Sequence, residues 1–402
     1  MVAPVVRAMA RRGCDTRMLA LTTAHSYLSN RGIPHFGYQD FPEAADPRAV
    51  AYGEALSGPD VPGRQQVPRR ESVAYLGVNF LDMVEEVGES EARARYAARQ
   101  RQAFLPIATM RRLLERERPD LVVVTSSPRT EKALAVAARE KGIPVACIVD
   151  LLDVHGMPAE AYPGYADRFL VLSEAVRQTF LDYGCRPEQV VVTGNPAFDR
   201  LSTPQAIAAG AELRRVRGWG TKRVILWASQ IEPSVHPFTG EPADPTLPGR
   251  IEQALRGFVR EREGVRLVVR HHPSDPADFV PGPQVEFSPQ EEDLGALLHA
   301  VDAVVVMTST VGLEAAIVGR PVLSVECSVF SKGMPYSAMG IAEGVAKPEE
   351  LASSLDRVFS GSGKSRQTIN APAVGAATGK VCEELLSILS ERCSERKTEI
   401  SK

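Results

Sequence analysis

Short runs of valine, isoleucine and leucine alternate with longer helical patterns along most of the chain. Each run is continuous rather than interleaved with polar residues, which is typical of strands that helices cover on both faces. Strand–helix–strand repeats of this kind predict parallel, doubly wound sheets and an α/β fold. The expected strands are residues 16–23, 120–127, 143–150, 168–173, 189–195, 223–229, 265–272, 302–308 and 321–326. The helical patterns between them include residues 130–142, 173–184, 250–264 and 310–319.

The length of 402 residues is too great for one core and suits two domains. One α/β series ends near residues 185–200, and a second begins with its own strand. We therefore expect two Rossmann-like domains facing a cleft. We expect the first domain at residues 1–188 and the second at residues 189–372, followed by a C-terminal helix and charged tail at residues 373–402.

Three segments depart from the simple repeat. Residues 39–71 and 232–250 are rich in proline, glycine and charge, and we expect long loops there, either excursions or lids. The chain also opens with a helical pattern, MVAPVVRAMARRG, whereas a doubly wound domain normally begins with a strand. Two alternatives stay open: a variant that starts with a helix, or a chain that lacks the first strand of its N-terminal domain.

Composition excludes several classes of protein. The formal net charge of -3 and arginines mixed with acids argue against a nucleic-acid partner. The six cysteines are spread singly, which argues against a zinc site or a disulfide framework and fits a reducing compartment. No apolar run approaches the ~18 residues of a transmembrane helix, and no signal-peptide pattern is present. We expect a cytoplasmic protein, with peripheral contact at the inner face of the membrane left open.

Three consecutive hydroxyl residues follow the strand at 302–308, in the segment VVVMTSTVGLEAAIVGRPVL. In an open α/β sheet, ligands bind beyond the carboxyl ends of the strands, where helix N-termini present free N–H groups. Ser309 and Thr310 are therefore predicted to bind phosphate oxygens, and Glu314, one turn on, to accept from the hydroxyls of a ribose. The alternative is a plain N-cap followed by a solvated acid.

Other strands also end in polar residues. In the segment LVVRHHPSD, His271 and His272 lie at the end of the apolar strand. An imidazole there can bind a diphosphate or help a leaving phosphate carry its charge. Ser229 and Gln230 follow the strand at 223–229, and Asn195 lies in VVVTGNPAFDRL. Ordinary turn chemistry is the alternative for these last three residues.

The motifs VVVTGNPAFDRL, LVVRHHPSD and TSTVGLEAAIVGRPVL, in this order, resemble the C-terminal half of GT-B glycosyltransferases and of UDP-N-acetylglucosamine 2-epimerases. The last two also resemble motifs of CDP-glycerol glycerophosphotransferases. The resemblance covers about residues 120–345. It implies that residues 1–188 are the acceptor-side domain and residues 189–372 the nucleotide-sugar-binding domain. The implied substrate is a UDP-linked sugar, with no cofactor and no bound metal. It implies contacts of His272 with the diphosphate, of Ser309 and Thr310 with its terminal oxygens, and of Glu314 with the ribose. Residues 331–345 would border the sugar.

The N-terminal half bears on the reaction type. The epimerases carry acids after two consecutive strands, and here Ser126 or Ser127 stands at the first place and Asp150 at the second. The loss of one acid puts epimerase chemistry in doubt, because that chemistry needs a positioned acid and base. A transferase needs one base for the acceptor hydroxyl, and Asp150, Asp153 and His155 are the candidates, with ordinary loop polarity as the alternative.

The leading hypothesis is a glycosyltransferase that moves a sugar from a nucleotide donor to a glycan or lipid-linked acceptor in cell-envelope or exopolysaccharide biosynthesis. An epimerase acting on UDP-N-acetylglucosamine is the second hypothesis. A catalytically silent protein that binds nucleotide sugars is the third.

Overall fold

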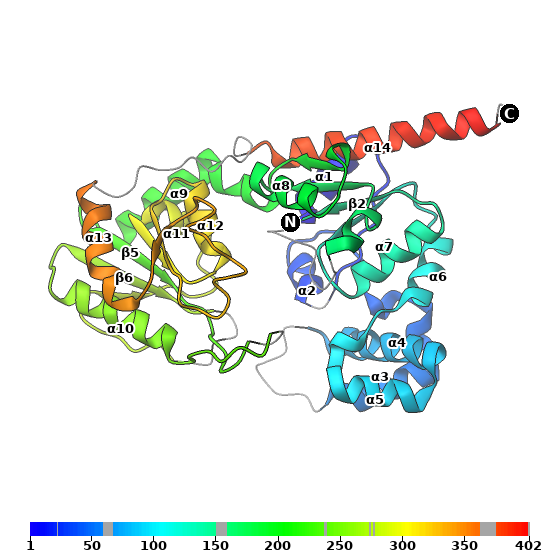
Figure 1. The fold of residues 1–402 in the computed structure, drawn as a ribbon, viewed down its shortest axis with the longest axis horizontal. Coiled ribbons are helices and arrows are strands. Elements are labelled where there is room, and N and C mark those ends of the chain that lie inside the picture. The colour runs from blue at the N-terminus through cyan, green and yellow to red at the C-terminus, as the bar shows by residue number, and fades with distance from the viewer. Residues whose placement is uncertain are drawn as a thin grey trace. The chain divides into compact units, whose positions relative to one another are not determined.

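The computed structural model describes residues 1–21, 23–58, 67–149, 159–236, 239–272, 275, 278–361 and 375–400. The chain divides into two compact units (Figure 1). Unit 1 comprises Met1–Ala197 together with Ala376–Lys402, and unit 2 comprises Phe198–Gly375. Unit 2 is thus a continuous stretch of chain, whereas unit 1 is built from both ends of it.

The sheet of unit 1 is parallel and follows chain order, β1-β2-β3-β4. Its strands are β1 (Val122–Thr125), β2 (Val145–Ile148), β3 (Arg168–Val171) and β4 (Val190–Val192). Helix α7 (Thr130–Glu140) connects β1 to β2, and α8 (Glu174–Asp182) connects β3 to β4. The strands predicted in these four regions are confirmed, and the described sheet winds in one direction only.

Two helices from opposite ends of the chain cover one face of this sheet. Val5 and Met9 of α1 (Val2–Arg11) pack with Val381 and Leu385 of α14 (Ala377–Ile400), over apolar side chains of β2 and β3. The C-terminal helix, predicted as a separate segment, therefore belongs to the core of unit 1.

The boundary of unit 1 also differs from the predicted end at residue 188. Val190–Val192 pairs with β3, so unit 1 continues to Ala197. The strand predicted at residues 16–23 is wrong. Among the described residues of that region, the pairing consists of one parallel bridge between Leu19 and Phe36.

A group of helices completes unit 1 (Figure 1). These are α2 (Thr23–Ser29), α3 (Pro47–Ser57), α4 (Arg69–Val87), α5 (Glu89–Arg99) and α6 (Ile107–Glu117). The loop predicted at residues 39–71 is thus wrong in part. Asp46 caps α3 by accepting from the Arg48 N–H, with Pro47 at the first helical position. Gly77 lets α4 pack closely on α3, because a Cβ there would lie 1.9 Å from the Ala49 carbonyl oxygen.

The sheet of unit 2 has parallel strands in the order β10-β9-β8-β5-β6-β7. They are β5 (Arg223–Ala228), β6 (Val265–Arg270), β7 (Val285–Phe287), β8 (Ala303–Val306), β9 (Val322–Val325) and β10 (Glu343–Val345). The first strand, β5, lies in the middle. The chain adds β6 and β7 on one side and then β8, β9 and β10 on the other, so the winding direction reverses between β5 and β8.

The helices of unit 2 are α9 (Pro204–Val216), α10 (Leu247–Arg260), α11 (Leu294–Ala300), α12 (Thr310–Ile317) and α13 (Leu351–Ser360). Ile225 and Trp227 of β5 lie in a core that includes side chains of α10 and α13. Strand β8 is buried along its whole length, as its continuous apolar run predicted. The strands predicted in this half are confirmed. β7 and β10 were not predicted, because each of these short strands contains an acid and leaves no continuous apolar run, unlike the three valines of β4.

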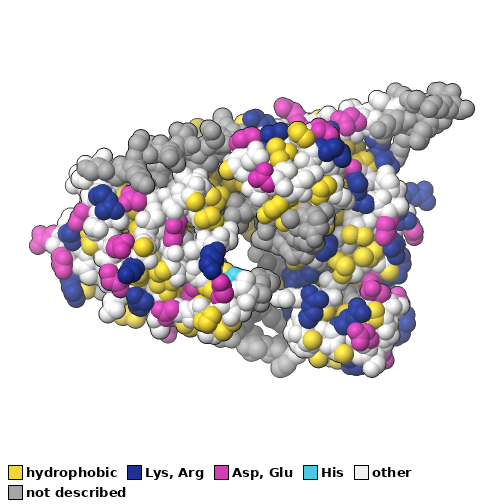
Figure 2. Space-filling model, viewed as in Figure 1, with side chains coloured by type: hydrophobic (Ala, Val, Ile, Leu, Met, Phe, Trp, Pro, Cys, Tyr) yellow, Lys and Arg dark blue, Asp and Glu magenta, His cyan; other side chains and the backbone are white. Residues whose placement is uncertain are grey.

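Charged side chains of both signs are interspersed on the face shown in Figure 2. Two ion pairs illustrate this mixing of arginines with acids, since Arg69 pairs with Glu54 and Arg111 with Glu140. Among the described residues, no helix has the length and apolar character needed to cross a bilayer.

Candidate functional site

The predicted donor-binding residues of unit 2 follow the carboxyl ends of its strands. Because all strands are parallel, these ends share one edge of the sheet. Residues 229–230 follow β5, residues 308–310 follow β8, and residues 271–272 follow β6. β5 and β8 are neighbours at the reversal of winding, which is the place where open α/β sheets bind ligands.

Two hydrogen bonds connect the ends of β5 and β8. The Thr308 N–H donates to Gln230 Oε1 at 2.7 Å, and Gln230 Nε2 donates to Thr308 Oγ1 at 3.1 Å. Ser229 is buried, and its N–H donates to the Arg270 carbonyl at 2.9 Å. Gln230 and Ser229 therefore fix the positions of the strand ends relative to one another.

Ser309 begins α12 as its N-cap. Its hydroxyl accepts from the Val311 N–H at 3.3 Å, as the capping alternative predicted. The Ser309 side chain is half-buried, and Thr310 is exposed at the first position of the helix. The Gly312 N–H donates to the Ser309 carbonyl at 2.9 Å. The positive end of the helix makes this region attractive to an anion.

Tyr336 and Gly312 hold α12 against the sheet. The Tyr336 hydroxyl donates to the Ser309 carbonyl at 3.0 Å. A Cβ on Gly312 would lie 2.9 Å from Val306 Cγ2 and 3.1 Å from Tyr336 Cε2. Glycine is therefore needed for the close contact between the first turn of α12, the end of β8 and the tyrosine ring.

Glu314 lies within α12 and is only 8% exposed. Burial raises the pKa of Glu314, while the positive charges of Arg200 and Arg270 act in the opposite direction. Arg200 Nη2 is 3.4 Å from Glu314 Oε2, and the arginine side chain is itself 55% exposed. A buried carboxylate beside a helix start can accept strong hydrogen bonds from the hydroxyls of a ligand.

The two histidines after β6 have different surroundings. His271 Nε2 is 3.9 Å from Glu252 Oε2, and its ring makes an edge-to-face contact with Phe287 at 5.6 Å between centroids. His271 thus packs between α10 and β7. His272 is exposed, and its carbonyl accepts from the Asp275 N–H at 2.9 Å. Of the two imidazoles, only that of His272 is exposed at this edge.

The candidates of unit 1 are placed as follows. Asp150, Asp153 and His155 lie outside the described residues. Asn195 is buried, and its Oδ1 accepts from the Ala197 N–H at 2.9 Å, which is turn chemistry. Ser126 is also buried, at the end of β1. In the part of the chain that the structure describes, no three His, Cys, Asp or Glu side chains are arranged to hold a metal ion.

Three side chains near the carboxyl ends of these strands were not predicted from the sequence: Arg200, Tyr336 and Glu232. Arg200 and Tyr336 both lie in segments that the sequence analysis had selected. The partner of Arg200, Glu314, is 114 residues away, and the partner of Tyr336, Ser309, is 27 residues away. Glu232 is buried and accepts from Ser328 Oγ at 2.8 Å and from the Val329 N–H at 2.7 Å. It joins the segment after β5 to the segment after β9. No local pattern marks such long-range pairs.

Comparison with known proteins establishes the fold. Residues 1–196, slightly less than half of the chain, match the family model of the glycosyl transferase 4-like domain. No curated protein matches the chain in sequence. Among solved structures, the chain is similar to UDP-GlcNAc 2-epimerase from Neisseria meningitidis bound to UDP-GlcNAc, with a TM-score of 0.59 and 15% identity over 96% of each chain.

Two further structures are similar over nearly the whole chain. The S. aureus MnaA–UDP structure has a TM-score of 0.58 and 14% identity, covering 97% of this chain and 93% of that one. The glycosyltransferase SnogD from Streptomyces nogalater has a TM-score of 0.50 and 16% identity, covering 96% and 95%. The chain therefore has the fold of the GT-B glycosyltransferases and UDP-N-acetylglucosamine 2-epimerases, as the motifs had implied.

Proposed function

We infer that this chain, which has the GT-B fold, is a glycosyltransferase that uses a nucleotide sugar as donor. The observation that carries the proposal is the edge of unit 2 at the reversal of winding. There the start of α12, capped by Ser309, and the buried Glu314 lie within one turn of each other beside the end of β8.

In this proposal the donor binds along that edge. The positive end of α12, with Ser309 and Thr310, binds the diphosphate oxygens, and Glu314 accepts from the ribose hydroxyls. As the bond to the sugar breaks, negative charge develops on the leaving diphosphate. The helix N-terminus and the exposed His272 are suited to stabilising that charge. We expect UDP as the nucleotide.

The acceptor hydroxyl must lose a proton during transfer, and Asp150, Asp153 and His155 remain the predicted bases. We propose a glycan or lipid-linked acceptor in cell-envelope or exopolysaccharide biosynthesis, and a location in the cytoplasm with peripheral contact to the membrane as an option. No cofactor is part of the proposal, since the nucleotide sugar is a substrate.

Epimerisation of UDP-N-acetylglucosamine is the second candidate. It is favoured by the near-complete overlap of the chain with an epimerase that has UDP-GlcNAc bound. It is disfavoured by the turn between β1 and α7, where the epimerases carry an acid. Ser126 and Ser127 lie there instead, and neither supplies a carboxylate; Ser126 is also buried. We therefore rank transfer above epimerisation.

Incubation of the protein with UDP-N-acetylglucosamine, with and without an envelope glycolipid fraction, tests the proposal. We expect UDP release only when acceptor is present, measured by chromatography of the nucleotide. A new sugar or free UDP in the absence of acceptor would instead identify an epimerase. If no UDP-, CDP- or GDP-linked sugar binds even at millimolar concentration, both enzyme assignments fail and a silent binding protein remains.

A further inference from the structure

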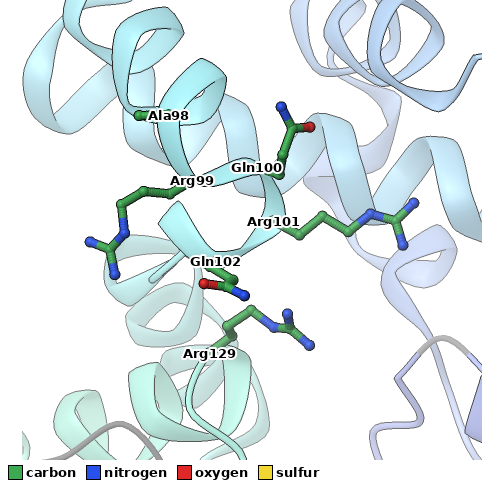
Figure 3. A pocket seen from close by; sticks show the side chains of 6 residues that line it. All are labelled: Ala98, Arg99, Gln100, Arg101, Gln102 and Arg129. Carbon is green, nitrogen blue, oxygen red and sulfur yellow. The ribbon is translucent and has the colours of Figure 1, made fainter. Parts of the chain in front are cut away.

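A hollow of about 500 Å³ lies on unit 1. It is formed where α5 ends, by the following 3₁₀ turn Gln100–Ala103, and by the residue that precedes α7. Its lining is basic and polar (Figure 3). The lining residues are Ala98, Arg99, Gln100, Arg101, Gln102 and Arg129.

Two of the three arginines point to the same side. In Figure 3, the side chains of Arg101 and Arg129 extend in one direction, whereas Arg99 extends in the other. Gln100, which lies between Arg99 and Arg101 in the chain, has a φ of 50°. This positive φ turns the backbone so that the side chains of Arg99 and Arg101 extend in different directions. Tyr75 gives a second indication. Burial raises the pKa of its phenol, and the positive charges of Arg129 and Arg101 act against that rise, so both guanidinium groups are near one hydroxyl.

Neither guanidinium group is neutralised by a carboxylate of the described residues. Two arginines of the neighbouring helix α5 differ in this respect, because Arg93 pairs with Glu89 at 2.6 Å and Arg95 with Glu91 at 2.8 Å. Arg129 is half-buried at the N-cap of α7, a helix of eleven residues whose cap makes no side-chain hydrogen bond. The positive end of that helix adds to the charge of the two arginines.

We propose that this hollow is a binding site for a phosphate group of the acceptor. Arg101 and Arg129 would each donate to phosphate oxygens through a planar guanidinium, which matches phosphate in a two-point contact. The Gln102 amide supplies a further donor. The assignment to the acceptor rests on the proposed transferase function, whereas the anion site itself does not.

The size of the hollow indicates more than a bare ion. A volume of about 500 Å³ is within the usual range of small-ligand sites. It exceeds the space of one phosphate and leaves room for the group attached to it. The ligand chemistry is therefore a phosphate or diphosphate ester, either of a soluble sugar or of a lipid carrier.

Titration calorimetry of the full chain with inorganic pyrophosphate, in the presence of saturating UDP, tests the site. UDP occupies the proposed donor site, so pyrophosphate reports on unit 1. We expect one equivalent to bind, with affinity about tenfold lower in Arg101→Gln and in Arg129→Gln, because each change removes a hydrogen bond to a charged group. Arg99→Gln is the matched control and should bind as the unchanged protein does. Equal affinity in all three variants, or no binding, would overturn the proposal.

Separate arms distinguish the source of the phosphate and the dependence on function. Binding of glucose 1-phosphate supports a soluble ester, and sedimentation with phosphatidylcholine vesicles only when they contain phosphatidic acid supports a lipid-linked one. Both signals must weaken in Arg129→Gln. If pyrophosphate binds through Arg129 but UDP does not bind, the site stands and the proposed function fails. If UDP binds and pyrophosphate does not, the function stands and the site is refuted.

Discussion

The two sheets of this protein are both parallel, yet they differ in how the chain winds through them. In unit 1 the described strands follow one another in chain order, from β1 to β4. In unit 2 the chain starts at β5 in the middle and reverses direction before β8. In open α/β sheets, ligands bind at the carboxyl ends of the two strands that flank such a reversal, which are β5 and β8 here.

This difference in winding affects where polar residues can form a binding site. In unit 2, Ser309 and Glu314 lie at a reversal, where helix α12 starts beside a neighbouring strand end. In unit 1, the basic and polar residues around Arg101 and Arg129 lie at the end of helix α5 and not at a reversal of winding. We therefore expect two separable anion sites, and the following predictions test that separation.

Glu314→Ala should have the largest effect. In the proposed binding mode the carboxylate accepts two hydrogen bonds from the ribose, so without it we expect UDP to bind about a hundredfold more weakly. Calorimetry with UDP measures this loss, and pyrophosphate binding at Arg129 should be unchanged. Glu291→Ala, at an exposed acid in the segment between β7 and α11, is the control. The same loss in the control would show that the effect is one of general charge.

Gly312→Ala should destabilise unit 2. The added Cβ would lie within 3.1 Å of Tyr336, and overpacking of this kind costs about 1–3 kcal/mol. Gly257→Ala, within α10, meets no atom within 4 Å and should instead stabilise by about 0.5–1 kcal/mol. Urea unfolding followed by tryptophan fluorescence reports on unit 2, because Trp219 and Trp227 both lie there. Equal changes in the two variants would contradict the close contact of α12 with β8.

Gln230→Ala should have a smaller effect. It leaves the N–H of the buried Thr308 without its acceptor, and we expect a loss of about 1–2 kcal/mol in the free energy of unfolding. Gln178→Ala removes an exposed hydrogen bond to Asp182 on α8 of unit 1, and should change stability by no more than about 0.5 kcal/mol. A Gln230 variant as stable as the Gln178 variant would mean that the ends of β5 and β8 do not depend on this contact.

The pH dependence of UDP binding should show the smallest effect. Burial raises the pKa of Glu314, so its protonated form persists above the ordinary carboxyl range. Because the carboxylate is the form that accepts from the ribose, affinity should rise a few-fold as the pH increases through this pKa. Glu314→Gln should remove the slope, and a slope that persists would assign it to another group.

The same group affects stability with the opposite sign. A carboxyl whose pKa is higher in the folded state than in the unfolded state stabilises the fold most at low pH. This contribution is lost as the pH rises through the folded-state pKa. Without ligand, the wild-type protein should therefore lose stability over that window relative to Glu314→Gln, as thermal unfolding at several pH values would show.

Much of the fold could be predicted from the sequence, because long apolar strands buried on both faces leave continuous runs. β5, β6 and β8 were found in this way. The short strands β7 and β10 each contain an acid and leave no continuous apolar run. Helix α3 lies in a stretch whose proline and glycine content indicated a loop. In that stretch, Asp46 and Pro47 start a helix, so residues associated with turns served as a cap.

The candidate site was predictable where its members are close in sequence. Ser309, Thr310 and Glu314 share one strand end and one helix, so a local pattern sufficed. The bonds between Gln230 and Thr308 join residues 78 positions apart, and nothing local indicates them. His271 is a similar case, since its partners come from α10 and β7 and direct the ring into packing.

The joint packing of α1 and α14 has a consequence for synthesis on the ribosome. Cys382 Sγ lies 4.0 Å from the Val5 carbonyl oxygen, across a separation of 377 residues. At roughly 5–20 residues per second, the N-terminal helix must wait tens of seconds for its partner to emerge. The later-made, contiguous Phe198–Gly375 can mature before the earlier-made part is complete. We therefore expect nascent chains arrested before α14 to protect the β5 region from protease while α1 stays sensitive.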